Sequence, residues 1–515
     1  MQRFHCLPFA AQCLYVRLIS RVGPWFRCRR LVYEELGDLN SAFAALAEAD
    51  LLLVAQELVV CELGKLYTHA ELQQALASSL ERTKFKDKAS LLLAIEKLGL
   101  EAAALTAQLR NFDGQDIVAP QGAEQVQLLQ LLFFGNRRQS LTEFVLSDLG
   151  VASYFPYHLD RGQRLFASRI AVDEYLACAA LSDCWYTLRE EEDAQALLQL
   201  SQLVLDKDVH CASTENRWFR LCNGLARDLE RQGENDRALA LYARSLQHPS
   251  RERRTRILEK AGRWREALAL CDDIRGNPWC EQERDAAARI LPRVRRKLQL
   301  DVPARAREKF NEMQLCLAQT GGPVELVAAE ALLTQWQSVH YVENTLMNTL
   351  FGLAFWEQIF APLPGAFHNP YQSAPGDMYE PGFRQRRQHM LDARLQELRS
   401  VPLQQTLCAA YRRYQGYQCR WVNWRYIDID LVERATTIVP DAHLMAIWER
   451  MLFDPGENRR GFPDLIALGH EPGDYCLIEI KGPGDALQDS QKRWLRFFQA
   501  QAIPASVAWV EWGNA

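Results

Sequence analysis

Two short apolar segments near the end of the chain, separated by a turn, constrain the fold more than any other part of the sequence. The first reads Gly-Phe-Pro-Asp-Leu-Ile over 461–466, and the second reads Leu-Ile-Glu-Ile-Lys-Gly-Pro over 477–483. Short apolar runs bounded by Gly and Pro are typical of β-strands, and a turn over 470–474 would join the two as a hairpin. The sequence therefore predicts a pair of neighbouring strands in this region.

Charged side chains share one face of this hairpin. Successive side chains of a strand point to opposite faces, so Glu479 and Lys481 lie on one face. Ile478 and Ile480 then point into the core. If the hairpin closes, Asp464 approaches the polar face from the first strand.

Two carboxylates and a lysine placed in this way suit a site that holds a divalent cation against a phosphodiester. Mg²⁺ or Mn²⁺ prefers oxygen ligands, which Asp464, Glu479 and the backbone carbonyl of Ile480 could supply. The cation can polarise a phosphoryl oxygen and lower the pKa of bound water, and the ammonium group of Lys481 can stabilise developing charge. The alternative is a surface salt bridge on an ordinary hairpin, and the pattern alone leaves both open.

The overall charge gives no sign of nucleic-acid binding, because 60 Lys and Arg against 65 Asp and Glu leave a formal net charge of −5. Any contact with DNA must therefore use local basic clusters. The candidates are Lys84, Lys86, Lys88, Arg137, Arg138, Arg251, Arg253, Arg254, Arg256, Arg459 and Arg460. Taken alone, each cluster is better explained as the solvated face of a helix.

The chain contains fourteen cysteines but no Cys-x-x-Cys pair and no Cys/His spacing suited to zinc. Most of them lie in apolar stretches, where a free thiol behaves as a small apolar side chain. No run of residues approaches the length of a membrane span. We therefore expect an intracellular protein, cytoplasmic in a bacterium or nuclear in a eukaryote, with no membrane contact and no small-molecule cofactor.

A length of 515 residues allows three or four domains. The apolar patterns predict a mainly α-helical front two thirds and an α/β rear. The expected divisions are a helix-turn-helix or winged-helix-like unit over 1–65, a second helical unit over 66–150, helical repeats over 151–330 and an α/β domain over 331–515. Within the second unit, 114–122 is predicted to be a loop.

An internal repeat supports the helical hairpins. Leu229, Gly233, Ala238, Leu239 and Leu241 recur at the same spacing as Leu258, Gly262, Ala267, Leu268 and Leu270, twenty-nine residues further on. A glycine between two helices is typical of stacked helical hairpins. The offset is short for regular tetratricopeptide units, so we predict degenerate repeats.

Taken together, the C-terminal motifs resemble the VRR-NUC domain, a branch of the PD-(D/E)xK, restriction-endonuclease-like fold. The motifs are Arg460-Gly461-Phe462-Pro463-Asp464-Leu465, Ile478 to Leu487, and Gln491-x-x-Trp494-Leu495. Upstream, Leu350-Phe351-Gly352-Leu353 with Trp356, Phe367-x-Asn369-x-Tyr371-Gln372 and Phe133-Phe134-Gly135-Asn136 resemble the Fanconi-associated nuclease family in its bacterial form. The resemblance implies a SAP-like DNA-binding domain over 66–150 and tetratricopeptide-like repeats before the nuclease domain.

The resemblance also implies which residues form the active site. The implied metal ligands are Glu343, Asp464, Glu479 and the carbonyl of Ile480, and the implied catalytic residues are Glu343, Asp464, Glu479, Lys481 and Gln491. Gln491 would steady the lysine or a phosphate. Without the resemblance, Glu343 is more simply explained as a carboxylate that favours the start of the apolar helix after it. The family often flanks this glutamate with glycines, whereas this chain has Val342 and Asn344.

The implied activity is a structure-selective endonuclease that cuts near the base of 5′ flaps in branched double-stranded DNA. A 5′-to-3′ exonuclease activity and a role in interstrand crosslink repair accompany it. The cluster from Arg251 to Arg256 is the candidate pocket for a 5′-terminal phosphate, and two copies could assemble on DNA. Two alternatives stay open, namely a Holliday-junction resolvase-type nuclease and a catalytically inactive DNA-binding helical-repeat scaffold.

Overall fold

A computed structural model of the protein describes residues 2–21, 23–81, 83–136, 146, 148–302, 308–318 and 321–513. The chain divides into two compact units, 1–141 and 142–515. Arg137 and Arg138, which are predicted to contact DNA, lie outside the described residues. Within the described ranges, every helix is too short or too polar to cross a membrane.

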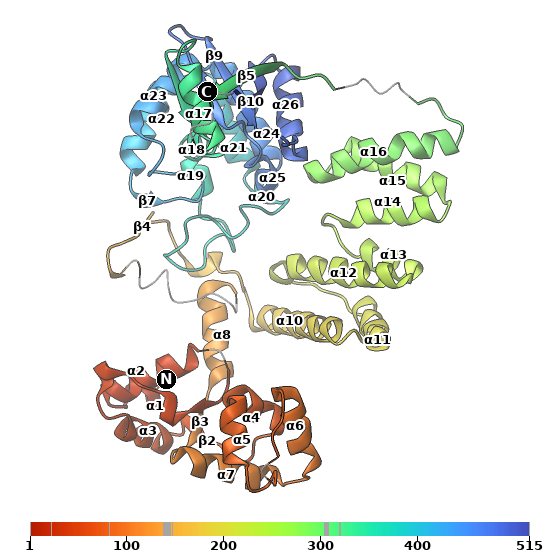
Figure 1. The fold of residues 1–515 in the computed structure, drawn as a ribbon. Helices are drawn as coiled ribbons and strands as arrows, with labels where there is room; N and C mark the ends of the chain where they lie inside the picture. Colours follow the sequence, from red (N-terminus) through yellow and green to blue (C-terminus); the bar gives the residue numbers. More distant parts are fainter. Residues whose placement is uncertain are drawn as a thin grey trace. The chain divides into compact units, whose positions relative to one another are not determined.

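The first unit combines short helices with a small antiparallel sheet (Figure 1). Its helices are α1 (Gln2–His5), α2 (Phe9–Ile19), α3 (Leu39–Glu48), α4 (Val60–Leu66), α5 (His69–Ala75), α6 (Lys88–Lys97), α7 (Ala102–Asp113) and α8 (Ala123–Phe134). Its strands are β1 (Phe26–Arg27), β2 (Leu52–Val54) and β3 (Ile117–Pro120), in the order β1-β3-β2.

The central strand β3 corrects one prediction. A loop over 114–122 is wrong, because the buried residues Ile117 and Val118 pair with strands on both sides. The sheet also joins segments from both sides of residue 65, where a domain boundary is predicted. The strand is only four residues long and is flanked by turn residues, so the sequence pattern there predicts a loop.

The second unit begins with a stack of helices in which each packs against the next (Figure 1). They are α10 (Arg169–Glu190), α11 (Ala194–Leu205), α12 (Ala212–Gln232), α13 (Asn235–Ala243), α14 (Ser250–Lys260), α15 (Trp264–Gly276) and α16 (Glu281–Lys297). The internal repeat falls on α12 with α13 and on α14 with α15. Gly233 and Gly262 have φ of 90° and 72° between the paired helices, a conformation that glycine adopts readily. The predicted helical hairpins are confirmed.

The rest of this unit is built around a five-stranded mixed sheet with the order β5-β10-β9-β8-β6. The strands are β5 (Glu312–Ala318), β6 (Ser338–Tyr341), β8 (Leu465–Leu468), β9 (Tyr475–Lys481) and β10 (Ala505–Gly513), and β4 (Ser153–Tyr154) pairs separately with β7 (Tyr417–Gln418). Strands β8 and β9 are antiparallel, so the predicted hairpin is confirmed. The sheet includes β5, which lies before residue 331. The α/β region therefore begins earlier than predicted, because β5 pairs in parallel with β10 at the far end of the chain.

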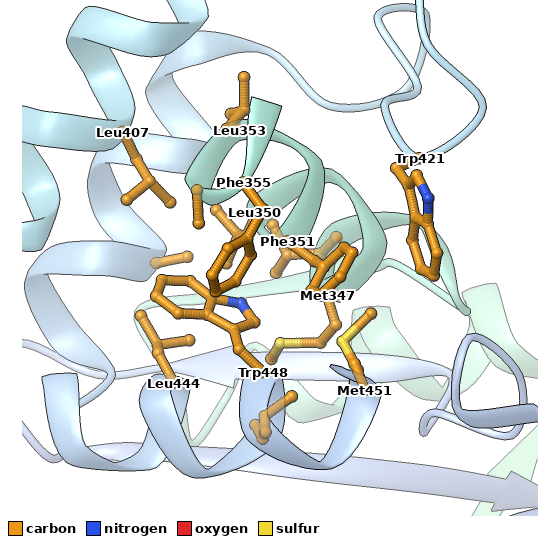
Figure 2. Packing of buried hydrophobic residues seen from close by; sticks show 14 of the residues in the cluster. Met347, Leu350, Phe351, Leu353, Phe355, Leu407, Trp421, Leu444, Trp448 and Met451 are labelled. Carbon is orange, nitrogen blue, oxygen red and sulfur yellow. The ribbon is translucent and has the colours of Figure 1, made fainter. Parts of the chain in front are cut away.

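Helices cover both faces of this sheet. They are α17 (Val324–Leu332), α18 (Thr345–Ala354), α19 (Trp356–Ile359), α20 (Phe383–Arg386), α21 (Gln388–Leu398), α22 (Leu403–Tyr414), α23 (Ile429–Ile438), α24 (Asp441–Phe453), α25 (Pro455–Asn458) and α26 (Asp489–Ala500). Helix α17 packs on the face that carries Ile478 and Ile480, as the alternation predicts. The apolar helix α18 packs on the other face, where Phe351 and Phe355 lie among side chains of α22 and α24 (Figure 2).

Close packing at Gly352 in α18 gives a test of this core. A Cβ atom at Gly352 would lie 2.7 Å from Cγ2 of Val422 and 2.9 Å from Cβ of Trp421. We expect Gly352→Ala to lower the free energy of unfolding by about 1–3 kcal/mol, because an overpacked core must shift its neighbours.

Urea unfolding followed by circular dichroism measures this effect. Gly276→Ala is the matched control, because a Cβ at this helical position would have no heavy atom within 4 Å. Its stability should stay equal or rise by up to about 1 kcal/mol, since alanine favours the helix over glycine. Equal stability of the two variants would contradict the described packing.

Candidate active site

Asp464 and Glu479 are brought together by the pairing of β8 with β9. Asp464 immediately precedes β8, and Glu479 lies within β9. Both side chains are buried, with 9% and 1% of their residue surface exposed. The main-chain N–H of Ile480 donates to Oδ2 of Asp464 at 2.8 Å, which fixes that carboxylate against β9.

Two side chains hold the carboxylate of Glu479. Nζ of Lys481 lies 2.8 Å from Oε1 of Glu479, and Nε2 of Gln491 donates to the same oxygen at 2.5 Å. Gln491 is itself fixed, because its Oε1 accepts from the main-chain N–H of Gln488 at the start of α26. Gln491 therefore steadies the glutamate, whereas the sequence predicts that it steadies the lysine or a phosphate.

Both carboxyl groups of the pair have raised pKa values. Burial raises the pKa of Glu479 to about 8, with a further contribution from the charge on Asp464, while Lys481 lowers it. Burial likewise raises the pKa of Asp464 to about 6, against the lowering effect of the Ile480 N–H and Lys481. One lysine thus compensates two carboxylates only in part.

The donor set fits a divalent cation. Oε2 of Glu479 is buried and has no hydrogen-bond partner among the described residues. An orphaned carboxylate oxygen beside a second buried carboxylate is a natural ligand for a hard cation. Across the part of the chain that is described, no three His, Cys, Asp or Glu side chains converge as a metal-holding group. Asp464 and Glu479 would supply two carboxylate ligands, to which the Ile480 carbonyl and water molecules could add.

Glu343 lies next to this pair but is separate from it. It stands between β6 and α18, and the main-chain N–H of Val342 donates to the carbonyl oxygen of Asp464 at 2.8 Å. Its side chain is exposed and accepts hydrogen bonds from Tyr341 and Asn344. Its charge contributes to the raised pKa of Asp464. The geometry therefore places Glu343 within electrostatic reach of the site.

The segment before Asp464 is seated against α26. Gly461 has φ of 81°, and a Cβ there would lie 2.7 Å from the main-chain carbon of Ser490. Phe462 stacks on Trp494 with ring centroids 4.1 Å apart, and Nε1 of Trp494 donates to the carbonyl of Arg460 at 3.0 Å. The three C-terminal sequence motifs thus form one structural unit.

Helix α26 also contacts the helical stack. Arg493 donates to Asp285 of α16 and to Glu457, both at 2.9 Å. A second contact joins Arg450 of α24 to the buried Glu281 of α16 at 3.0 Å. The sequence does not indicate the two contacts with α16, because Arg493 and Asp285 are 208 positions apart and Arg450 and Glu281 are also far apart along the chain.

The sequence does not indicate that two other residues, Tyr341 and Glu325, lie near the site. Tyr341 bonds to Glu343, and Glu325 at the start of α17 adds to the negative field that raises the pKa of Asp464. Neither residue belongs to a recognisable motif.

Three arginines of the cluster from Arg251 to Arg256 are engaged in ion pairs within the fold. Arg251 is buried, bonds to Glu283 at 2.6 Å and to Asp273 at 2.8 Å, and lies over the Trp279 ring. Its prediction as a DNA contact is therefore corrected, because its guanidinium is fully used within the fold. Arg253 pairs with Glu230 and Arg256 with Glu252, which also reduces their availability.

Other predicted DNA contacts lie at the surface or in a pocket. Lys84 and Lys86 are exposed, and Lys88 begins α6. Arg459 and Arg460 line a pocket of about 320 Å³. That pocket also includes His248, Trp279, Tyr379, Arg384 and Glu457, so it lies where the helical stack meets the α/β region. These residues remain predicted DNA contacts.

The raised pKa of Glu479 predicts how stability varies with pH. The metal-free folded protein holds this proton more tightly than the unfolded chain, whose carboxyl group has a pKa near 4.5. Stability should therefore fall as pH rises from about 4.5 to about 8. Glu479→Gln removes this contribution, so the variant should gain stability relative to the wild type as pH rises.

Thermal unfolding in chelator from pH 5 to pH 8.5 measures the difference. Asp464→Asn should show the same trend over a lower range that ends near pH 6, where the pKa of Asp464 lies. A difference in melting temperature between wild type and Glu479→Gln that is constant with pH would contradict the described burial.

Comparisons with known proteins cover the whole chain. The VRR-NUC domain model matches residues 401–512, and the model described as the FAN1 HTH domain matches residues 1–53. The Fanconi-associated nuclease 1 homolog of Pseudomonas aeruginosa is 36% identical over 510 residues, covering 98% of this chain and 90% of that protein. The homolog of Arabidopsis thaliana is 25% identical, covering 96% of this chain and 62% of that protein.

Solved structures give the same result. A crystal structure of paFAN1 bound to 5′ flap DNA with a 2-nucleotide flap and a gap matches with a TM-score of 0.83 and 35% identity. The match covers 100% of this chain and 93% of that one. A second structure, with a 1-nucleotide 5′ flap, matches with a TM-score of 0.82.

Proposed function

The chain belongs to the Fanconi-associated nuclease family, and from this premise we propose that it cuts DNA near the base of 5′ flaps as a structure-selective endonuclease. It is a DNA nuclease that depends on a divalent metal ion. The observation that carries the flap specificity is the full-length similarity to paFAN1 structures with flap DNA, combined with an intact pair of buried carboxylates. We extend the proposal to 5′-to-3′ exonuclease action and to interstrand crosslink repair.

The chain's own residues have distinct roles in this chemistry. The bound cation would polarise the scissile phosphate and acidify a water molecule. Asp464 and Glu479 would hold it, and we propose Mg²⁺ or Mn²⁺ because the donors are hard oxygen atoms. Lys481 places an ammonium group beside Glu479, where it can stabilise negative charge on the phosphate. Gln491 keeps Glu479 in position.

We also propose that the protein acts on chromosomal DNA inside the cell. All fourteen cysteines are free, which suits a reducing compartment. Assembly of two copies on one flap is also proposed, and light scattering of the protein with and without flap DNA determines the stoichiometry.

Cleavage of a labelled 5′ flap tests the proposed activity. Asp464→Ala and Glu479→Gln should each reduce the cutting rate by at least about 100-fold, because each weakens the hold on the cation that would stabilise charge on the reacting phosphate. Affinity for the flap, measured by fluorescence anisotropy, should change little. Glu449→Gln, which alters a surface carboxylate in an ion pair with Arg399, is the control and should cut normally.

Two further arms complete this experiment. Chelator should abolish cutting, and added Mg²⁺ or Mn²⁺ should restore it. A four-way junction cut faster than the flap would favour the resolvase alternative, and full activity of either carboxylate variant would refute the site.

A 5′-terminal phosphate is the second part of the proposed substrate. We propose that it binds in the pocket lined by Arg384, Arg459 and Arg460, whose guanidinium groups suit a phosphate. Flaps with a 5′ phosphate should then be cut faster than flaps with a 5′ hydroxyl. Arg384→Ala and Arg460→Ala should each remove most of that preference.

Two variants serve as comparisons in the phosphate assay. Arg254→Ala tests the original cluster, and Arg263→Ala, at a surface residue paired with Glu266, is the control. Loss of the preference in Arg254→Ala, with retention in the two pocket variants, would move the phosphate site back to the Arg251–Arg256 cluster.

A further inference from the structure

Two neighbouring side chains hold both oxygens of the Glu343 carboxylate. The hydroxyl of Tyr341 donates to Oε2 at 2.7 Å, and Nδ2 of Asn344 donates to Oε1 at 3.1 Å. Glu343 is exposed, so without these bonds its flexible side chain would sample several rotamers. The two donors therefore select one arrangement.

The two donors are themselves anchored to the segment that carries Asp464. Tyr341 is the last residue of β6 and pairs with Leu465, the residue after Asp464. Asn344 accepts from the main-chain N–H of Phe462 through Oδ1, at 3.1 Å. Its side chain thus bridges the Asp464 segment and Glu343.

The backbone at Asn344 makes this bridge possible. Its φ is 53°, in the left-handed region that asparagine tolerates better than most residues. In this conformation, between β6 and α18, the side-chain amide of Asn344 reaches both Glu343 and the main-chain N–H of Phe462. A glycine would accept the same backbone but would supply neither hydrogen bond.

We propose that Tyr341 and Asn344 are positioning residues that hold Glu343 beside Asp464, ready to contribute to cation binding. This inference rests on the metal site proposed above. If Tyr341 and Asn344 instead kept Glu343 away from the cation, removing their hydrogen bonds would strengthen metal binding.

Calorimetric titration of the full chain with Mn²⁺, without DNA, separates the two. Tyr341→Phe removes one hydroxyl and keeps the ring. Asn344→Asp keeps an acceptor for Phe462 and a residue that tolerates positive φ, but replaces the donor to Glu343 with a carboxylate oxygen. Each variant should bind Mn²⁺ about 10- to 100-fold more weakly, as is typical when a ligand loses its supporting hydrogen bond.

Controls separate this effect from general damage. Tyr426→Phe, at a tyrosine that is 64% exposed, should leave the affinity unchanged. In a Glu343→Gln background, Tyr341→Phe should cause no further loss, because the hydroxyl acts through Glu343. Circular dichroism confirms that each variant is folded.

The outcomes are distinct. Unchanged or tighter Mn²⁺ binding by Tyr341→Phe, or an equal loss in the Glu343→Gln background, overturns the inference. Unchanged binding by Glu343→Gln alone overturns it too, while leaving the Asp464 and Glu479 site intact. Failure of Asp464→Ala to weaken Mn²⁺ binding would instead refute the proposed metal site.

Discussion

Repulsion between two buried carboxylates is the constraint on which the structure of the candidate active site depends. Asp464 and Glu479 face one another in a nearly dry environment, where charge is costly unless it is compensated. Lys481, the Ile480 N–H and Gln491 compensate it in part. The remaining imbalance suits the binding of a cation, which would compensate the charge of both acids.

The parts of the fold that could be predicted are those with local signals. The β8–β9 hairpin has alternating apolar residues around a turn, and the helix ends at Gly233 and Gly262 have glycine at the required position. Strands β3 and β5 could not be predicted with equal success. Each pairs with strands that are distant in the sequence, and no hairpin turn in the sequence indicates the pairing.

For the site, local pattern and resemblance predicted the acidic residues, the lysine and Gln491, but not the contacts that hold them. Tyr341 has no sequence signal, and the bond from Gln491 to Glu479 depends on how α26 docks. The prediction that Arg251 contacts a phosphate fails for the same reason. A run of arginines looks like a binding surface until the structure shows that Glu283, thirty-two residues away, neutralises Arg251 inside the protein.

Helix α26 links the helical stack to the candidate active site. Gln491, which holds Glu479, and Arg493, which bonds to Asp285 of the helical stack, lie within a single helical turn. A single turn of α26 therefore connects the helical stack to Glu479. A displacement of α16 at Asp285 would therefore act on the same helical turn that holds the Glu479 carboxylate.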